Sequence, residues 1–197
     1  MADTDFYLAG GTALALYIGH RPSVDFDWFI TRLGEPERLF QKLRAFEVDF
    51  DVQSVALETV YLAIDAVQVS FIGYNYPLLQ PPRMMGEPGV RLADPDDIAC
   101  MKLSAIASRG SRKDFVDLYF MINRFRSLKD YLQLYRIKYQ NRDIGHLMRS
   151  LVYFGDAEAE PEIVTAKSFD WQKMKEDFER WVRDLATRMG NSIVPAE

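Results

Sequence analysis

Cysteine and histidine are scarce in this sequence: Cys100 is the single cysteine, and His20 and His146 are the only histidines. One cysteine cannot form a disulfide within the chain, so a disulfide-stapled fold is excluded. Three residues of these two types are too few for the four His and Cys ligands of a structural zinc site. We therefore expect carboxylate oxygens to hold any metal ion that binds here.

Long apolar runs are also missing. No segment reaches the roughly 20 residues needed to span a bilayer, and the first five residues, Met-Ala-Asp-Thr-Asp, are acidic, unlike the start of a signal peptide. A single cysteine suits a reducing compartment. These features favour a cytoplasmic protein that does not interact with membranes.

Charge is unevenly distributed over the 197 residues. Residues 1–101 carry 7 basic and 15 acidic side chains, residues 102–149 carry 11 basic and 4 acidic ones, and residues 150–197 carry 6 and 10. The basic middle segment is compatible with a surface that faces an acidic site or a polyanion. A solvated helical face would give the same pattern, so charge alone leaves both interpretations open.

The hydrophobic pattern divides the chain into a mixed first part and a helical second part. Helix signals in the second part include Asp94 as N-cap before Pro95, and Ser111 three residues before Asp114, which has the spacing of a capping box. In the first part we expect Thr12 to cap a short helix. The expected strands are 6–9, 24–30, 50–55, 58–64 and 66–74, and a loop is expected at 77–88. The expected helices are 13–18, 35–46, 94–108, one that begins at 111, 127–138, 143–154 and 170–189.

Two aspartates, Asp25 and Asp27, interrupt an apolar run that reads as a strand. Residues two apart on a strand share a face, so both carboxylates should point one way, while Val24, Phe26 and Trp28 point into the core. Two neighbouring carboxylates repel each other unless a cation lies between them. Oxygen ligands of this kind suit Mg²⁺ or Mn²⁺, which are commonly held by one or two carboxylates together with substrate phosphates.

Gly10 and Gly11 supply the complementary half of such a site. Glycine lets backbone N–H groups approach a phosphate closely, and a helix N-terminus favours its negative charge. Each feature by itself is weak evidence, but a Gly-Gly pair and an Asp-x-Asp in one strand–turn–helix–strand pattern are much more specific.

These motifs resemble the nucleotide-binding signature of the DNA polymerase β-like nucleotidyltransferase superfamily, and more narrowly the AbiEii/AbiGii nucleotidyltransferase toxins of type IV toxin–antitoxin systems. The resemblance implies an α+β fold with a mixed sheet flanked by helices and a helical C-terminal region. It implies a nucleotidyltransferase core at 1–93 and a helical region at 94–197 that completes the active-site cleft. The residues that carry it are Gly10-Gly11-Thr12, Arg21-x-Ser23-x-Asp25-x-Asp27, and downstream Lys102, Arg109, Lys113, Asp114 and Asp117.

Position by position, the resemblance implies a role for each of these residues. Asp25 and Asp27 would hold the catalytic Mg²⁺ or Mn²⁺. Lys102 would contact the triphosphate of an NTP, and Asp114 or Asp117 would position a base or an active-site lysine. The remaining nucleotide-binding positions would be Gly10, Gly11, Thr12, Arg21, Ser23 and Arg109.

The sequence departs from the superfamily pattern at one position. A third carboxylate is usual on a neighbouring strand, but here Ser70 occupies the position that we align with it, with Gln68 on the same face and Asp65 at a hairpin turn. The missing acid leaves three possibilities: Asp114 or Asp117 substitutes for it, transfer is slow, or nucleotide binds without being transferred.

Three functions follow from this pattern. The first is a metal-dependent, toxin-like nucleotidyltransferase that moves a nucleotide from an NTP to a hydroxyl acceptor, with the tRNA 3′ end as one acceptor found in the family. The second is a catalytically weak nucleotide-binding module that acts through a protein partner such as an antitoxin. The third is an antibiotic-type nucleotidyltransferase, which the Lys102-to-Asp117 motif argues against.

Overall fold

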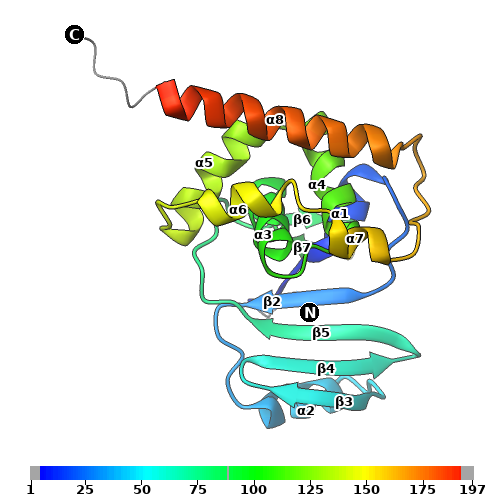
Figure 1. The fold of residues 1–197 in the computed structure, drawn as a ribbon. Helices are drawn as coiled ribbons and strands as arrows, with labels where there is room; N and C mark the ends of the chain where they lie inside the picture. The colour runs from blue at the N-terminus through cyan, green and yellow to red at the C-terminus, as the bar shows by residue number, and fades with distance from the viewer. Residues whose placement is uncertain (1–4, 88, 192–197) are drawn as a thin grey trace. The chain divides into compact units, whose positions relative to one another are not determined.

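The computed structural model describes residues 5–87 and 89–191 (Figure 1). The chain divides into two compact units, Met1–Ile98 and Ala99–Glu197, and the division falls inside helix α3 (Pro95–Ser108). None of the helices in the described ranges combines the length and the apolar character needed to cross a bilayer.

The first unit is built on a seven-stranded mixed sheet in the order β3-β4-β5-β2-β1-β7-β6. The pairs β1/β7 and β2/β5 are parallel and the other four are antiparallel. This architecture confirms the expected α+β fold with a mixed sheet. The strands are β1 (Tyr7–Ala9), β2 (Phe26–Ile30), β3 (Asp51–Ala56), β4 (Thr59–Ile64), β5 (Val67–Gly73), β6 (Arg83–Met85) and β7 (Val90–Leu92).

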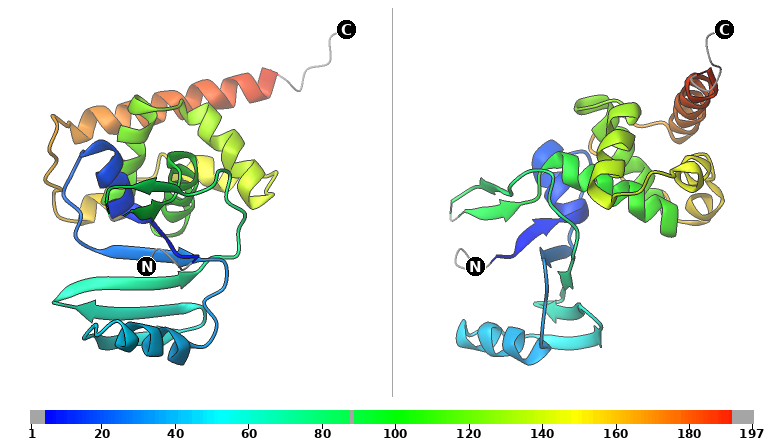
Figure 2. Two further views of the ribbon diagram at one scale, coloured as in Figure 1. Left: turned by 180° about the vertical axis from the view of Figure 1, so that it is seen from behind. Right: turned by 90° about the vertical axis from the view of Figure 1, so that its left-hand side faces the viewer.

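Helix α2 (Pro36–Ala45) covers one face of the outer strands (Figure 2). Its Leu39 and Leu43 are buried there, as their helical spacing predicts. Strand residues that alternate toward this face complete the cluster, because side chains two apart on a strand point the same way. The buried members are Phe6, Leu39, Leu43, Val60, Leu62, Val69 and Phe71, with Trp28 packed against them.

The turn between β4 and β5 follows the sequence prediction. Asp65 and Ala66 form it, and both have positive φ, at 50° and 63°. Two central residues with positive φ match the twist of a two-residue hairpin. This turn fixes the register of β5, the strand that carries Ser70.

Several local predictions were wrong. Helix α1 spans Gly10–Ile18, so Gly10 and Gly11 lie in its first turn, and the N-cap is Ala9 instead of Thr12. The segment 77–88, expected to be a loop, contains strand β6 because Arg83–Met85 pairs with β7. Val24 precedes β2 and is 70% exposed, so it does not enter the core, and Phe26 is 36% exposed.

The described part of the second unit is helical. The segment expected to be one helix at 143–154 gives the shorter α6, with α7 after it. Aromatic contacts of Phe178 with Phe115 and Trp181 join α8 to α4 and extend the packing along α8. Its helices, besides the second part of α3, are α4 (Arg112–Arg124), α5 (Leu128–Tyr139), α6 (Gly145–Ser150), α7 (Gly155–Ala159) and α8 (Trp171–Asn191).

Candidate active site

Asp27 lies directly over the first turn of α1. Gly10 has φ of +70°, a conformation that side chains rarely adopt, and a Cβ placed on it would lie 2.6 Å from Asp27 Oδ2. Conformation and space therefore both require glycine at this position. The Asp27 carboxylate is held close to a helix N-terminus, where the backbone N–H groups of the first turn have no intrahelical acceptor.

Gly11 leaves room for two polar side chains. A Cβ here would lie 2.6 Å from Arg21 Nη2 and 3.1 Å from Ser23 Oγ. The Arg21 guanidinium is further oriented by donating from Nη1 to the carbonyl of Pro22 at 3.0 Å. The structure thus gathers Gly11, Arg21 and Ser23 at the start of α1, as a phosphate-binding role requires.

Thr12 connects α1 to the segment that leads into β2. Its hydroxyl donates to the backbone carbonyl of Asp25, and its Oγ1 lies 2.9 Å from Ser23 Oγ. The side chain is 6% exposed, so these bonds are shielded from water. Although Thr12 does not cap the helix, it fixes the backbone of Asp25 next to it.

Asp25 itself does not lie on the strand. β2 begins at Phe26, so the prediction that both aspartates occupy one strand is wrong by a single residue. Asp27 is half-buried within β2, whereas Asp25 is exposed just before it. The two carboxylates stay two residues apart, and Asp25 is held by Thr12 instead of by the sheet.

Ser70 pairs with Asp27 across the parallel strands β2 and β5. Paired residues project from the same face of a sheet, so the Ser70 and Asp27 side chains are neighbours on one face. The described residues contain no group of three His, Cys, Asp or Glu side chains arranged to hold a metal ion. Asp25, Asp27 and the Ser70 hydroxyl are nevertheless all oxygen donors, which is the donor type of Mg²⁺ and Mn²⁺ sites.

The downstream motif forms a cluster of four charged side chains in the second unit, three of them buried and the fourth, Arg109, exposed. Lys102 Nζ lies 2.9 Å from Asp114 Oδ1 and 2.6 Å from Asp117 Oδ2. Arg109 adds two bonds to Asp114, from Nε at 2.8 Å and from Nη2 at 3.1 Å. Two cations and two anions therefore meet with no net charge. Both aspartates are fully buried, and Lys102 is 5% exposed.

The ionisation of this cluster follows from its geometry. Burial by itself opposes the charged amine of Lys102, but the fields of Asp117 and Asp114 outweigh it, and the pKa of Lys102 is raised. Burial likewise opposes the Asp114 carboxylate, yet Lys102 and Arg109 hold the pKa of Asp114 below its ordinary value. Each partner thus keeps the other charged.

Asp114 does not serve as part of a capping box. Ser111 is the N-cap of α4, but its side chain makes no capping bond, and its Oγ lies 3.0 Å from Glu160 Oε2. The Asp114 carboxylate turns instead to Lys102 and Arg109. The Asp114 side chain therefore belongs to the ion-pair cluster and does not cap α4.

Asp97 lies in the first turn of α3, and sequence reasoning gave it no role. It is fully buried in the first unit, and both of its oxygens accept from the backbone N–H of Leu79 at 3.0 Å; Oδ2 also accepts from Gln80 at 3.2 Å. Asp97 therefore holds the segment between β5 and β6 onto the start of α3. Its place two residues after Pro95 gave no signal of this use.

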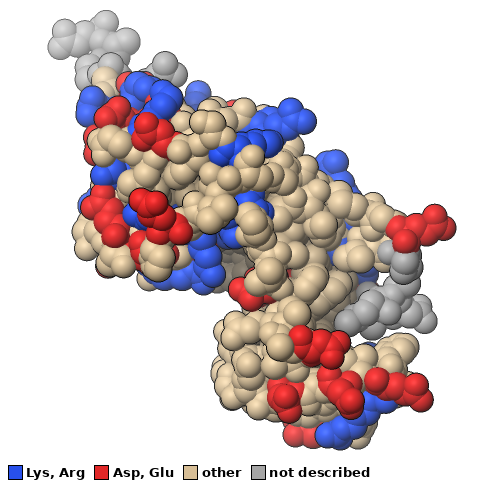
Figure 3. All heavy atoms as spheres, turned by 90° about the vertical axis from the view of Figure 1, so that its right-hand side faces the viewer, with Lys and Arg blue, Asp and Glu red and all other residues tan. Residues whose placement is uncertain are grey.

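The charge of the surface differs between the segments. In residues 102–149, Lys102 and Lys138 are buried, as are Asp114 and Asp117, so nine basic and two acidic side chains remain at or near the surface. The basic excess is therefore a surface property of this segment. In the lower part of Figure 3, where α2 and the outer strands lie, more of the charged surface is acidic than basic.

Comparison with known proteins identifies the family of this chain. A model of the family described as nucleotidyl transferase AbiEii toxin, type IV TA system, matches residues 2–53 and 53–188. An uncharacterised protein of Aquifex aeolicus (strain VF5) is 38% identical over 189 residues, which cover 91% of this chain and 87% of that protein.

Two solved structures share the fold at low sequence identity. A putative nucleotidyltransferase from H. pylori is 18% identical with a TM-score of 0.58, covering 98% of this chain and 92% of that one. MenT4, a nucleotidyltransferase toxin from Mycobacterium tuberculosis H37Rv, is 16% identical with a TM-score of 0.60, covering 91% and 80%. At these identities they show the fold alone. Because the family model spans nearly the whole chain, the protein belongs to the AbiEii nucleotidyltransferase toxin family of type IV toxin–antitoxin systems.

Proposed function

We propose that this chain is a metal-dependent nucleotidyltransferase that moves a nucleotide from an NTP to a hydroxyl acceptor and acts as a toxin. The observation that carries the proposal is the placement of Asp27 over Gly10, at the start of a helix whose first turn also gathers Arg21 and Ser23. This places a carboxylate beside backbone donors and a guanidinium, which is what binding a metal–triphosphate requires.

Each residue at the site has a part in this reaction. The N–H groups of Gly10, Gly11 and Thr12 would bind phosphate oxygens, and Arg21 would add positive charge where the pyrophosphate leaves. Asp25 and Asp27 would hold Mg²⁺ or Mn²⁺, which when bound helps to ionise the attacking hydroxyl and to neutralise the leaving group. The acceptor oxygen forms a bond to the α-phosphorus, the bond from that phosphorus to the bridging oxygen breaks, and pyrophosphate leaves.

This reaction needs a base that accepts the proton of the acceptor hydroxyl. Ser70 pairs with Asp27, and a serine hydroxyl does not act as a general base near neutral pH because its pKa is far too high. The acceptor would then lose its proton to Asp27, to water, or to an aspartate of the downstream motif. We therefore propose slow transfer by the wild-type chain.

The downstream residues would have a smaller part in substrate binding. A contact between Lys102 and the triphosphate would have to be shared, because its ammonium already bridges Asp114 and Asp117. Arg109 has a side chain that is 57% exposed, so an anion in solvent could reach its guanidinium while it pairs with Asp114. The exposed basic residues of 102–149 suit the backbone of an RNA acceptor such as tRNA.

The Ser70–Asp27 pairing also favours the second candidate, a catalytically weak module that binds nucleotide and acts through a protein partner such as a cognate antitoxin. Both candidates require NTP binding at the Asp27 site, and they differ in turnover.

Binding is tested by thermal unfolding with and without an NTP and Mg²⁺, since a ligand of the folded state raises the unfolding temperature. We expect a shift for the wild type and none for the double variant Asp25→Ala/Asp27→Ala. The control Glu37→Ala/Asp49→Ala removes the same charge from exposed positions and should keep the full shift. A full shift in the Asp25/Asp27 variant would place the nucleotide elsewhere.

Turnover is tested with a radiolabelled NTP and bulk tRNA. Ser70→Asp should raise metal affinity and transfer, since a third carboxylate adds attraction for the cation and offers a base. If Asp114 or Asp117 already supplies that function, Ser70→Asp should lower transfer by repulsion, and Asp114→Asn or Asp117→Asn should be the damaging change. NTP binding without transfer by either the wild type or Ser70→Asp would favour the partner-dependent candidate.

A further inference from the structure

The strand register aligns a row of side chains across one face of the sheet. Ala9 pairs with Asp27, Asp27 with Ser70, Ser70 with Tyr61, and Tyr61 with Ser54. Paired residues project from the same face, so this row runs from β1 to β3 on the face opposite α2. Neighbouring strands lie about 4.8 Å apart, so the backbones of Asp27 and Tyr61 are separated by about 10 Å.

Asp27 divides this row into two sides. On the β1 side, the chain continues from Ala9 into α1, where Gly10 lies against the Asp27 carboxylate. The other side contains Ser70 and then Tyr61, whose ring is on a strand that is one place from the edge of the sheet. The leaving and attacking oxygens of a phosphoryl transfer are roughly in line. If the pyrophosphate leaves toward α1, the acceptor hydroxyl must approach over β5 and β4.

Tyr61 is the aromatic side chain on the acceptor side of the row. It is 43% exposed, so its ring can be contacted from solvent. Around it the same face carries Ser54, Ser70 and Gln68, and Gln68 donates to Gln53 at 3.5 Å. An exposed aromatic ring among neutral amide and hydroxyl groups is the combination that binds a nucleobase, by stacking and by hydrogen bonds to its edge.

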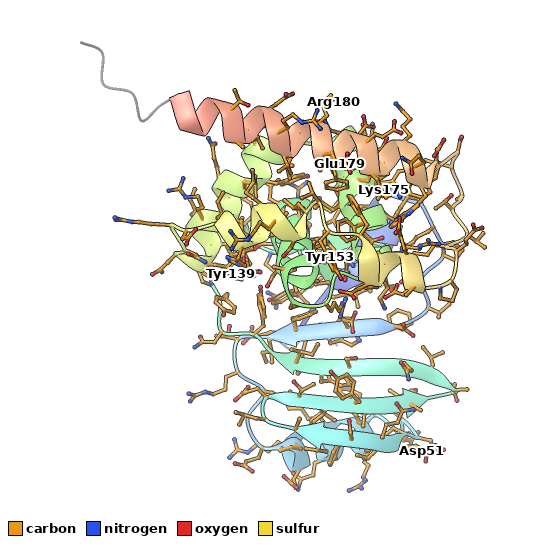
Figure 4. The ribbon with its side chains drawn as sticks, viewed as in Figure 1. Asp51, Tyr139, Tyr153, Lys175, Glu179 and Arg180 are labelled. Carbon is orange, nitrogen blue, oxygen red and sulfur yellow. The ribbon has the colours of Figure 1, made fainter. Side chains whose placement is uncertain are left out.

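The charges on this face limit what can bind there. Asp51, at one end of β3 (Figure 4), pairs with Ala63 and so projects from the same face as Tyr61, while Asp25 and Asp27 lie at the other side. Three carboxylates repel a phosphate that is not bound to a metal. An internal stretch of nucleic acid would bring such phosphates with it, whereas a terminal nucleoside with a free 3′ hydroxyl has none beyond its sugar.

We propose that the Ser70–Tyr61 strip is the acceptor subsite, and that Tyr61 stacks on the terminal base of a single-stranded RNA whose free 3′ hydroxyl receives the nucleotide. The inference deepens the proposed function and rests on it. Tyr61 positions the acceptor and takes no part in the proton transfer. Its hydroxyl is dispensable, because stacking uses the ring.

The test measures equilibrium binding of a fluorescently labelled ribo-trinucleotide that ends in adenosine with a free 3′ hydroxyl, in the absence of NTP. Tyr61→Ala should weaken binding about fivefold to a hundredfold, which is the range for loss of one base–aromatic stack. Tyr61→Phe should stay within about twofold of the wild type. Val55→Ala is the matched control: Val55 is 50% exposed, but it pairs with Val60 and projects from the opposite face.

A 3′-phosphorylated trinucleotide should bind more weakly than the free hydroxyl form, because its phosphate faces Asp27. The inference would be overturned if the wild type failed to bind the trinucleotide or if Tyr61→Ala bound it equally well. It would also be overturned if, in the turnover assay, the radiolabelled nucleotide were transferred to a polypeptide in place of RNA. The NTP/Mg²⁺ thermal shift is read separately for every variant. A normal shift with no effect of Tyr61 refutes the acceptor subsite alone, whereas no shift in the wild type refutes the proposed function.

Discussion

Replacing Lys102 with methionine tests whether the downstream cluster holds the helical unit together. The methionine keeps most of the side-chain volume but removes the ammonium that lies 2.9 Å from Asp114 Oδ1 and 2.6 Å from Asp117 Oδ2. Two fully buried carboxylates then lose this cation, while Arg109 still pairs with Asp114. Removal of one partner from a buried ion pair costs about 3–5 kcal/mol. Because Arg109 still pairs with Asp114, we expect about 3 kcal/mol.

That loss is large against the about 5–15 kcal/mol by which domains are stable. For 150–250 residues, 1 kcal/mol corresponds to about 2–4 °C, so the unfolding temperature should fall by about 6–12 °C. Chemical denaturation followed by circular dichroism gives the free energy, and calorimetry the temperature. Lys113→Met is the control, since Lys113 is exposed and neighbours the same aspartate in sequence, and it should change stability by less than about 0.5 kcal/mol.

The contribution of this cluster to the free energy of unfolding depends on pH in a predictable direction. The pKa of Asp114 is lowered in the folded state, so the stabilisation it contributes is present above its unfolded value and is lost as the pH falls through its folded value. The pKa of Lys102 is raised, so its contribution persists until the pH passes above its unfolded value. In Lys102→Met, Asp114 loses the ammonium that holds its pKa down, so its protonation at lower pH relieves buried charge.

The stability gap between wild type and Lys102→Met should therefore narrow from pH 7 to pH 4.5. Adding Asp117→Asn to Lys102→Met should recover a large part of the loss at pH 7, because a neutral amide replaces a buried carboxylate that has lost the Lys102 ammonium. A loss below about 1 kcal/mol at pH 7, or a gap that is the same at both pH values, would refute the idea that these charges are coupled in the folded protein.

Two further substitutions test the upstream site. Gly10→Ala should destabilise the protein by more than about 1 kcal/mol and reduce the NTP/Mg²⁺ thermal shift, since its φ is +70° and its new Cβ would meet Asp27 Oδ2. The control is Gly19→Ala, where φ is +56° and the space around the residue is open. It should lose only the stability that the backbone conformation costs and should leave the NTP/Mg²⁺ shift unchanged. Thr12→Val should cost about 1 kcal/mol and weaken NTP/Mg²⁺ binding by releasing the Asp25 carbonyl, whereas Thr12→Ser should retain both, as measured by unfolding and titration.

The sequence pattern was sufficient to predict strands β1 to β5, but not β6 and β7. Alternation along 58–64 and 66–74 predicted a hairpin about Asp65, and the structure has that turn, with the strands paired in one register. The position of Ser70 opposite Asp27 follows because a slip of one residue would turn Val69 and Phe71 out of the core. Burial of one face thus explains the register, whereas the choice of Ser70 itself came from the family resemblance.

Local signals failed where a tertiary contact used the same atoms. Thr12 has the composition of an N-cap, and Ser111 and Asp114 have the spacing of a capping box. In the structure Thr12 bonds to Asp25, Ser111 lies against Glu160, and Asp114 accepts from Lys102. A local cap and a long-range partner compete for one side chain, and sequence spacing contains only the local alternative.

Asp25 shows how sequence periodicity and tertiary contacts together determine the geometry of the site. Periodicity placed it on the strand with Asp27, where pairing with the sheet would have fixed its backbone; in the structure β2 starts one residue later and the Thr12 hydroxyl holds the Asp25 carbonyl instead. The geometry of the carboxylate pair therefore depends on α1 as well as on the sheet. Since the glycines of α1 also lie against Asp27, Arg21 and Ser23, one short helix sets the positions of the proposed metal ligands and of the proposed phosphate donors together. Movement of α1 would disturb both at once, which is why the effects of Thr12→Val and Gly10→Ala on nucleotide binding should exceed what their contact losses alone would give.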